Sequence, residues 1–587
     1  MQSFVNEWLF TLSAVMTLTL VGWPLTVLFR DGRRFVVLLA PMIGLITLPL
    51  LVGLIYVFAK VSFSWSALVA VGLMSLVAIT VALRWKPDRD EILFSLSFIL
   101  VVSALVTAIS TAATIQSGVP SITFIDGSDH AGYGHVADWL TKHNILRGPI
   151  VDPDVPYESW PQLMLSMDPR LSSFILVALV AVARNLSGLF AYDSTSAIVT
   201  TVGALGVAAV YARSRTVAIA VALALMTGVL TDLGRSGYFG KLAGYPAALV
   251  LLGLFMTSTR RDIRWIAAMI LLVIGVSALH SGFATAFLLC TIGTTYLAAK
   301  ASLQARGIDD RNLISRDTTF LALLIFVAIA ATGLFARPIK LPPLATFPHG
   351  WDWLLGRFLE LENPQADRVR SAFAWFNSLQ ATALGLQIAA VTVAFLARSV
   401  VALALCAWPL AVIIALYAAD QKWIALQLVG LQTWCTIAGI AILSDEAWAT
   451  GRKSVLVPVL AIGTMLVAIR IPRLAIAMDR YVFRTESQYR FKASQFDEIR
   501  KTVGFGIVEV DMDQPLPLIA VLNELGGRDT RLQWSPRAWT RAFVYRKWPL
   551  PHYTTQPDFR LTASGDPSST GELVLETPQY RLWRLKR

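Results

Sequence analysis

Long apolar segments fill most of the chain between Leu9 and Arg470, and their length limits the possible folds more than any motif does. A helix that spans a bilayer needs roughly 20 predominantly apolar residues, and about fourteen such segments occur here. With 56% hydrophobic and only 15% charged residues, the chain departs from soluble domains, in which about a quarter of the residues are charged. None of the segments alternates as the strands of a membrane barrel do. The sequence therefore predicts an α-helical polytopic membrane protein with about fourteen transmembrane helices.

Three regions interrupt the apolar pattern and divide the chain. Two of them are long polar loops, and the third is the C-terminal region, where alternating runs such as IVEVDMD and LVLE surround the helical stretch PLIAVLNELGG. This composition indicates a small soluble α/β domain. The predicted divisions are N-terminal transmembrane helices at 1–116, a loop at 117–170, a transmembrane core at 171–470 that includes the loop 337–374, a linker at 471–502 and the soluble domain at 503–587.

Basic residues cluster in alternate loops, for example at Arg30, Arg33 and Arg34 after the first helix. Such loops face the cytoplasm, so the loops 117–170 and 337–374 are expected on the outer side of the cytoplasmic (inner) membrane, in the periplasm, with the soluble domain. A full crossing by residues 171–189 would place the later basic loops outside. That segment also contains Arg184 and Asn185, which are unfavourable at lipid depth, so it is predicted not to cross. Topology and anionic lipid headgroups explain the net charge of +12 better than a nucleic-acid partner does.

The first polar loop carries the acidic motif FIDGSDHAGYGHVADWL, residues 124–140. Tyr133, Val136, Ala137 and Leu140 recur at helical spacing, which predicts a helix that begins near Asp129 and packs one apolar face on the bundle. Two interpretations of Asp129 remain open. It is a helix N-cap that accepts a backbone N–H, or it is a general base that faces the water interface.

The motif resembles a known signature. Asp129, His130, Tyr133 and Ala137 are similar to the first-loop signature of the GT-C superfamily of integral membrane glycosyltransferases, although His130 replaces the usual Glu. Further segments resemble the aminoarabinose and protein mannosyl transferases in the same order along the chain: residues 167–180, 207–229 and 278–289. The last of these places His280 near the position of a family Lys.

This resemblance implies an enzyme that transfers a sugar from a polyprenyl-phosphate-linked donor to a glycan, lipid or protein acceptor at the outer membrane face. Asp129 would be the general base and Asp126 would assist it. Cations are needed to stabilise the phosphate leaving group. The expected substrate-binding residues are His130, Tyr133, Arg170, Arg235, Lys241 and His280. For the cations the alternative is interfacial snorkelling, and for His280 it is a packing role.

The same residues also allow other functions and a metal cofactor. Asp126, Asp129, His130 and His135 could hold a divalent metal ion, but the two histidines lie roughly 140° apart on a helix. The three cysteines lie in apolar segments without metal-ligand spacing. A secondary transporter or flippase of lipid-linked sugar would need inverted repeats, which the chain does not show. A noncatalytic membrane assembly subunit remains a further alternative.

Overall fold

The computed structural model describes residues 2–30, 35–85, 87–123, 129–143, 161, 170–226, 239–258, 262–304, 311–336, 385–418, 422–468, 490–512, 515–526, 530–538, 553–566 and 571–586. Within these residues, eight helices are long and apolar enough to cross a membrane, which agrees with a helical membrane protein. The predicted total of about fourteen spans is not confirmed. The eight are α1 (Gln2–Thr26, continued to Phe29), α2 (Val36–Phe58), α3 (Phe63–Arg84), α4 (Arg89–Ser110), α9 (Gly188–Tyr211), α12 (Phe239–Thr257), α13 (Ile263–His280) and α14 (Gly282–Gln304).

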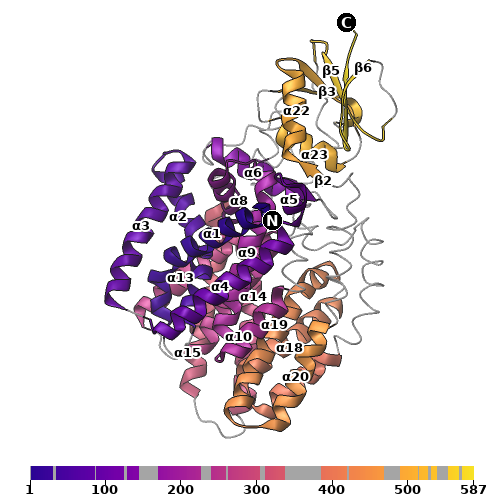
Figure 1. Ribbon diagram of the computed structural model, residues 1–587. Helices are drawn as coiled ribbons and strands as arrows, with labels where there is room; N and C mark the ends of the chain where they lie inside the picture. The colour runs from indigo at the N-terminus through magenta and orange to yellow at the C-terminus, as the bar shows by residue number, and fades with distance from the viewer. Residues whose placement is uncertain are drawn as a thin grey trace.

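Further helices continue the bundle (Figure 1). α14 packs against α15, α15 against α13, and α18 against both α14 and α19. Because these helices pack on the core helices, they belong to the same helical body. Their bounds are α10 (Arg215–Ala224), α15 (Arg311–Ala336), α18 (Val400–Ala418), α19 (Lys422–Ala449) and α20 (Lys453–Ala468), with a further helix at Gly385–Ala397.

The turns of the bundle gather at two ends. At one end the α1–α2, α3–α4 and α12–α13 turns meet: the Phe29 and Trp265 rings lie 6.3 Å apart, and the Arg30 guanidinium lies 5.8 Å from the Trp85 ring centroid. We call this the basic end, because the described parts of these turns include Arg30, Arg84 and Arg264. The other end, the α6 end, carries α5 (Ala112–Ser117), α6 (Asp129–Lys142) and α8 (Leu171–Arg184) (Figure 1).

The helices α1 and α2 pack backbone to backbone. A Cβ atom added at Gly22 would lie 1.9 Å from the carbonyl oxygen of Ala40, and one added at Gly44 would lie 2.0 Å from that of Leu18. Only glycine permits this approach. Small residues at helix contacts are typical of membrane bundles, in which packing drives association. The pair α1–α2 therefore forms a rigid wall, against which α9 also packs.

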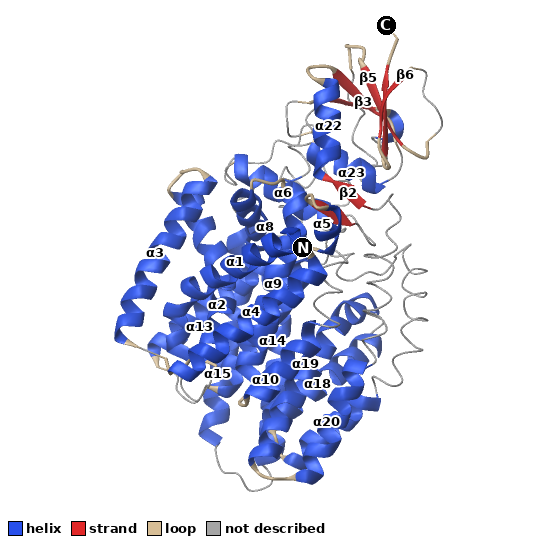
Figure 2. Ribbon diagram, in the orientation of Figure 1, coloured by secondary structure: helices blue, strands red, loops and turns tan. Residues whose placement is uncertain are grey.

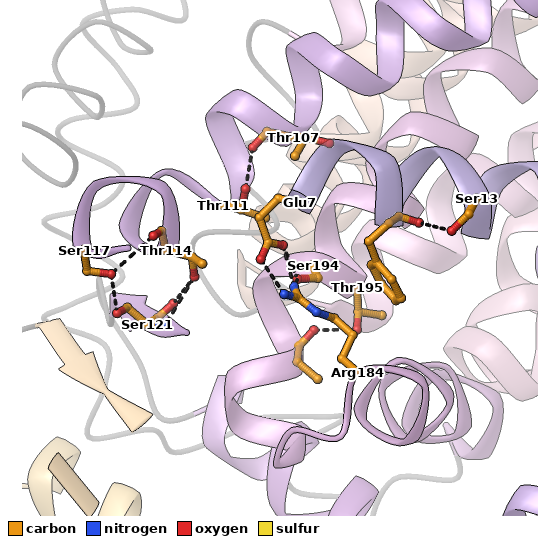
Figure 3. Close-up of polar contacts among 12 residues, drawn as sticks. Glu7, Ser13, Thr107, Thr111, Thr114, Ser117, Ser121, Arg184, Ser194 and Thr195 are labelled. Atoms are coloured by element: carbon orange, nitrogen blue, oxygen red, sulfur yellow. Dashed lines mark hydrogen bonds and ion pairs between the residues drawn. The ribbon is translucent and has the colours of Figure 1, made fainter. Parts of the chain in front are cut away.

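The helix α8 has 14 residues, fewer than the roughly 20 that a spanning helix needs. Arg184 at its C-terminal end donates both Nη atoms to the Glu7 carboxylate at 2.5 Å, and Nη1 also donates to Ser194 Oγ at 2.6 Å (Figure 3). Glu7 is buried. Asn185 then ends the helix in the left-handed conformation that asparagine tolerates. The charge of Arg184 is thus neutralised at the α6 end.

The C-terminal lobe, residues 490–586, holds most of the strands (Figure 2). In the described part of the chain its sheet has five strands in the order β4-β3-β5-β7-β6, with β3 parallel to β4 and β5 and β7 antiparallel to β5 and β6. Val508, Val510, Leu561 and Leu582 form its buried core. The elements are β2 (Arg490–Lys492), α22 (Ala493–Val503), β3 (Ile507–Val510), α23 (Pro515–Glu524), β4 (Arg531–Trp534), β5 (Phe559–Ala563), β6 (Glu572–Glu576) and β7 (Tyr580–Arg584).

The described part of the lobe begins at Arg490, within the predicted linker 471–502. The helix α22 buries Phe496, Ile499 and Val503, and this helical spacing is visible in the sequence. Deeper in the lobe, Tyr580 donates a hydrogen bond to the carbonyl oxygen of Pro517 at 2.9 Å. Burial, together with the nearby Glu524 carboxylate, raises the pKa of Tyr580 well above its usual value, so its hydroxyl remains a donor at neutral pH.

Candidate functional site

The helix α6 begins at Asp129, which confirms the helix predicted to start there. Its predicted apolar face is buried: Tyr133, Val136, Ala137 and Leu140 are all 5% exposed or less. Because a helix rises about 1.5 Å per residue, Asp129 stands one turn, roughly 6 Å, before Tyr133 along the axis. The side chains of Asp129 and His130 lie outside the described part of the structure.

Tyr133 connects three elements through its hydroxyl oxygen. That oxygen accepts one hydrogen bond from Arg170 Nη1 at 2.9 Å and another from the backbone N–H of Gly240 at 3.0 Å. Arg170 directly precedes α8, and Gly240 lies in the first turn of α12. The ring of Tyr133 packs against Phe174 and Phe239, with centroids 5.1 and 5.4 Å away. Tyr133 therefore fixes the position of the Arg170 guanidinium at the α6 end.

A second cation and a histidine lie near the contact between Tyr133 and Arg170. Lys241 follows Gly240 in the first turn of α12, and both Arg170 and Lys241 lie within electrostatic reach of His280, the last residue of α13. A Cβ atom added at Gly244 would lie 2.3 Å from His280 Cβ, so α12 and α13 approach closely here. The helix N-terminus of α12 adds a partial positive charge. This region of the protein is suited to an anionic group such as a phosphate.

Sequence reasoning missed two aromatic residues, Tyr245 beside His280 and Trp434 beside Tyr245. The Tyr245 ring stands edge-on to the His280 ring at 5.1 Å and edge-on to the Trp434 ring of α19 at 6.4 Å. Among the described residues, His280 Nδ1 and Trp434 Nε1 have no hydrogen-bond partner, although both side chains are buried. The indole Nε1 atoms of Trp23 and Trp408, away from this site, are in the same state, so these two atoms alone do not mark a ligand site.

One sequence signal could have found Tyr245, because it follows Lys241 by four residues and thus shares its helix face. Trp434 gives no such signal, since it lies inside an apolar helix and far from the motif in sequence. Its ring contact with Tyr245 is what relates it to the site.

The structure thus brings together four predicted residues: Tyr133, Arg170, Lys241 and His280. Asp126, Arg235 and the loop 337–374 lie outside the described residues. Where side chains are described, no group of three His, Cys, Asp or Glu residues is placed to hold a metal ion. The side chains of the candidate metal ligands Asp126, Asp129 and His130 lie outside the described residues.

Comparison with protein-family models, with curated proteins and with solved structures finds no match. A functional assignment therefore rests on the residues at the α6 end.

Proposed function

We propose that the protein is an integral membrane glycosyltransferase that moves a sugar from a polyprenyl-phosphate-linked donor to a hydroxyl acceptor on the outer face of the cytoplasmic membrane. The observation that supports this proposal is the convergence of Tyr133, Arg170, Lys241 and His280 beside the helix that begins at Asp129. The site combines cations for a phosphate with a carboxylate for an acceptor. It lies at one end of the bundle, where a lipid-anchored donor and a water-soluble acceptor can meet.

In the proposed reaction the acceptor hydroxyl oxygen forms a bond to the anomeric carbon of the donor sugar. The bond between that carbon and the phosphate oxygen breaks, and polyprenyl phosphate leaves with the bonding electrons. Asp129 accepts the hydroxyl proton, with Asp126 assisting. Arg170 and Lys241 stabilise the negative charge that develops on the phosphate, a contribution that is commonly the largest in such reactions.

The outer location follows from charge. The Arg- and Lys-rich turns lie at the basic end, and such turns face the cytoplasm in membrane proteins. The α6 end, with Tyr133 and Arg170, would then face the periplasm. The acceptor would be reached from that side, whereas the donor enters laterally from the membrane.

Substitution of Asp129 by Asn tests the proposed base. Asn caps a helix as well as Asp does, so folding should be preserved, while transfer from a polyprenyl-phosphate sugar should fall at least about 100-fold. Asp138→Asn on the same helix is the matched control. The Asp138 Oδ1 atom accepts the Gly188 N–H at 2.7 Å, and Asn retains an oxygen for this contact. The control should keep its activity.

The measurement is sugar transfer by purified protein, with thermal unfolding recorded for each variant. Loss of activity in Asp126→Asn but not in Asp129→Asn would move the base to Asp126. Full activity in both variants would exclude this mechanism.

A further inference from the structure

The segment that leads into the acidic motif is paired with the C-terminal lobe. The strand β1 (Ser121–Thr123) runs antiparallel to β2, with Ser121 opposite Lys492, Ile122 opposite Phe491 and Thr123 opposite Arg490. Ile122 and Phe491 are both fully buried. Residue 124, the first of the acidic motif, follows β1 directly. The lobe therefore contributes a strand next to the proposed catalytic residues.

Each of the two strands is fixed to its own part of the molecule. In β1, the Ser121 N–H donates to Thr114 Oγ1 at 3.1 Å, and the Ser117 and Ser121 hydroxyls lie 2.7 Å apart, which ties the strand to α5 (Figure 3). In β2, the carbonyl oxygen of Arg490 accepts a hydrogen bond from Gln579 Nε2 at 2.6 Å. The ladder thus joins α5 of the helical bundle, through β1, to the C-terminal lobe, through β2.

One backbone bond and one side-chain bond extend the contact beyond the ladder. The Ala493 N–H donates to the carbonyl oxygen of Pro120 at 3.0 Å, and Arg490 Nη2 donates to Gln116 Oε1 at 2.6 Å. These bonds flank the ladder and help to fix its register. Because Ala493 is the first residue of α22, the lobe helix itself is bonded to the chain just before β1.

A second contact reaches the other side of the motif. Glu524 at the end of α23 accepts a hydrogen bond from Ser187 Oγ, and the Phe190 and Phe496 rings lie 6.2 Å apart. Ser187 is the N-cap of α9. The backbone N–H of the next residue, Gly188, donates a hydrogen bond to Asp138 of α6. The lobe therefore holds both β1, before the acidic motif, and α9, on which α6 rests.

We infer that the C-terminal lobe is a positioning element of the proposed active site, in which Arg490 and Phe491 hold β1 so that the acidic motif meets the Tyr133–Arg170 site. This inference rests on the proposed function. The described contacts of Arg490 and Phe491 are with α5, β1 and the lobe, so these two residues act through β1 and are positioning residues. Misplacement of a catalytic group by about 1 Å can lower a rate by roughly 100-fold, so a fixed strand before the motif has catalytic value.

The test weakens and then restores the docking in one protein. In a Cys290→Ser background, the variant carries Ala493→Pro, Thr123→Cys and Arg490→Cys. Proline is tolerated at the first position of a helix, so Ala493→Pro removes the bond to Pro120 and preserves α22. Arg490→Cys removes the bond to Gln116. The facing positions 123 and 490 permit a disulfide, because opposite residues of antiparallel strands lie roughly 5 Å apart.

In the reduced variant, kcat should fall at least about tenfold while the KM for the polyprenyl-phosphate sugar stays within about twofold of wild type. Oxidation should restore kcat. Hydrogen exchange of the peptide covering residues 121–130 should be faster in the reduced protein than in the oxidised one, with lobe peptides unchanged. As a control, Glu576→Cys and Arg581→Cys introduce a disulfide between facing positions within the lobe sheet. This disulfide should change neither kcat nor the hydrogen exchange of residues 121–130.

The two proposals fail in different ways. Wild-type exchange and wild-type kcat in the reduced variant would overturn the positioning role. Faster exchange with unchanged kcat would also overturn it, because the docking would then hold β1 without affecting catalysis. Absence of sugar transfer by the wild-type protein would instead reject the proposed function, while the exchange readout would still report whether the lobe holds β1.

Discussion

At the residue scale, the hydroxyl of Tyr133 joins α6, the start of α8 and the start of α12. Two donors, Arg170 Nη1 and the Gly240 N–H, converge on its oxygen. A phenylalanine at this position would keep the ring contacts and remove the shared acceptor. Since the ring is buried, water does not readily replace that acceptor.

Tyr133→Phe should lower the free energy of unfolding by about 1 to 3 kcal/mol, because two donors lose their acceptor. Since Arg170 then loses its fixed position, the KM for the lipid-linked donor should rise roughly tenfold, which corresponds to about 1.4 kcal/mol. Thermal unfolding and transfer kinetics measure the two effects. Tyr211→Phe is the control: that hydroxyl donates to Leu249 O at 2.7 Å near the basic end, so the KM should not change. An unchanged KM in Tyr133→Phe would show that this contact does not serve donor binding.

Some residues of the candidate site could be predicted from the sequence, and others could not. Tyr133, Arg170, Lys241 and His280 were predicted because they are polar or follow a motif spacing, and the structure brings them together. Trp434 could not be predicted, because a buried Trp in an apolar helix has the same appearance whether it lines a site or fills the core. Only the ring contact between Trp434 of α19 and Tyr245 of α12 distinguishes the two roles.

At the element scale, α8 is held by charges at both of its ends. Arg170 contacts Tyr133 at the N-terminal end, and Arg184 pairs with the buried Glu7 of α1 at the other. A bidentate pair of this kind orients its partners as well as attracting them. The pair therefore fixes the direction in which α8 presents Arg170.

Glu7→Gln should destabilise the protein by about 3 kcal/mol, because it leaves the Arg184 charge without its counter-ion in a mostly buried position. The double variant Glu7→Gln/Arg184→Gln should recover part of that loss. Thermal unfolding in detergent measures both. As a control, Arg537→Ala removes a more exposed pair with Asp566 in the lobe and should change stability by less than about 1 kcal/mol. Wild-type stability in Glu7→Gln would show that the pair is dispensable.

Helical periodicity predicted where individual helices lie better than it predicted which elements pair with one another. The start of α6 was foreseen, since apolar spacing is a local property. The pairing of β1 with β2 was not, because each strand has three residues and the two lie far apart in sequence. Such short strands carry too few residues for an alternating pattern to be recognised.

At the scale of the whole molecule, the charged turns divide the bundle into two ends, the basic end and the α6 end with its lobe (Figure 1). This division follows from the alternation of basic loops, which the sequence shows directly. The predicted total of about fourteen spans is not confirmed by this arrangement. Among the described helices, only eight satisfy the length and hydropathy criteria.

The proposed orientation predicts cysteine labelling in intact cells, in a Cys290→Ser background. Val61→Cys, in the turn between α2 and α3, and Lys501→Cys, on α22, should react with a membrane-impermeant maleimide from outside. Arg452→Cys, in the exposed turn between α19 and α20, should react only after the membrane is permeabilised. Labelling of positions 61 and 452 from the same side would contradict the two-ended arrangement, and reversed labelling would place the site in the cytoplasm.

The pairing of β1 with β2 also has a consequence for biosynthesis. Gln116 and Arg490, which bond beside the ladder, are separated by 374 residues. At ribosomal rates of 5 to 20 residues per second, β1 emerges roughly 20 to 75 seconds before its partner strand exists. During that interval its backbone groups form an open edge, to which a strand of another chain can add. Ser121, already bonded within its own segment by Thr114 and Ser117, keeps part of this edge occupied until synthesis of the chain is complete.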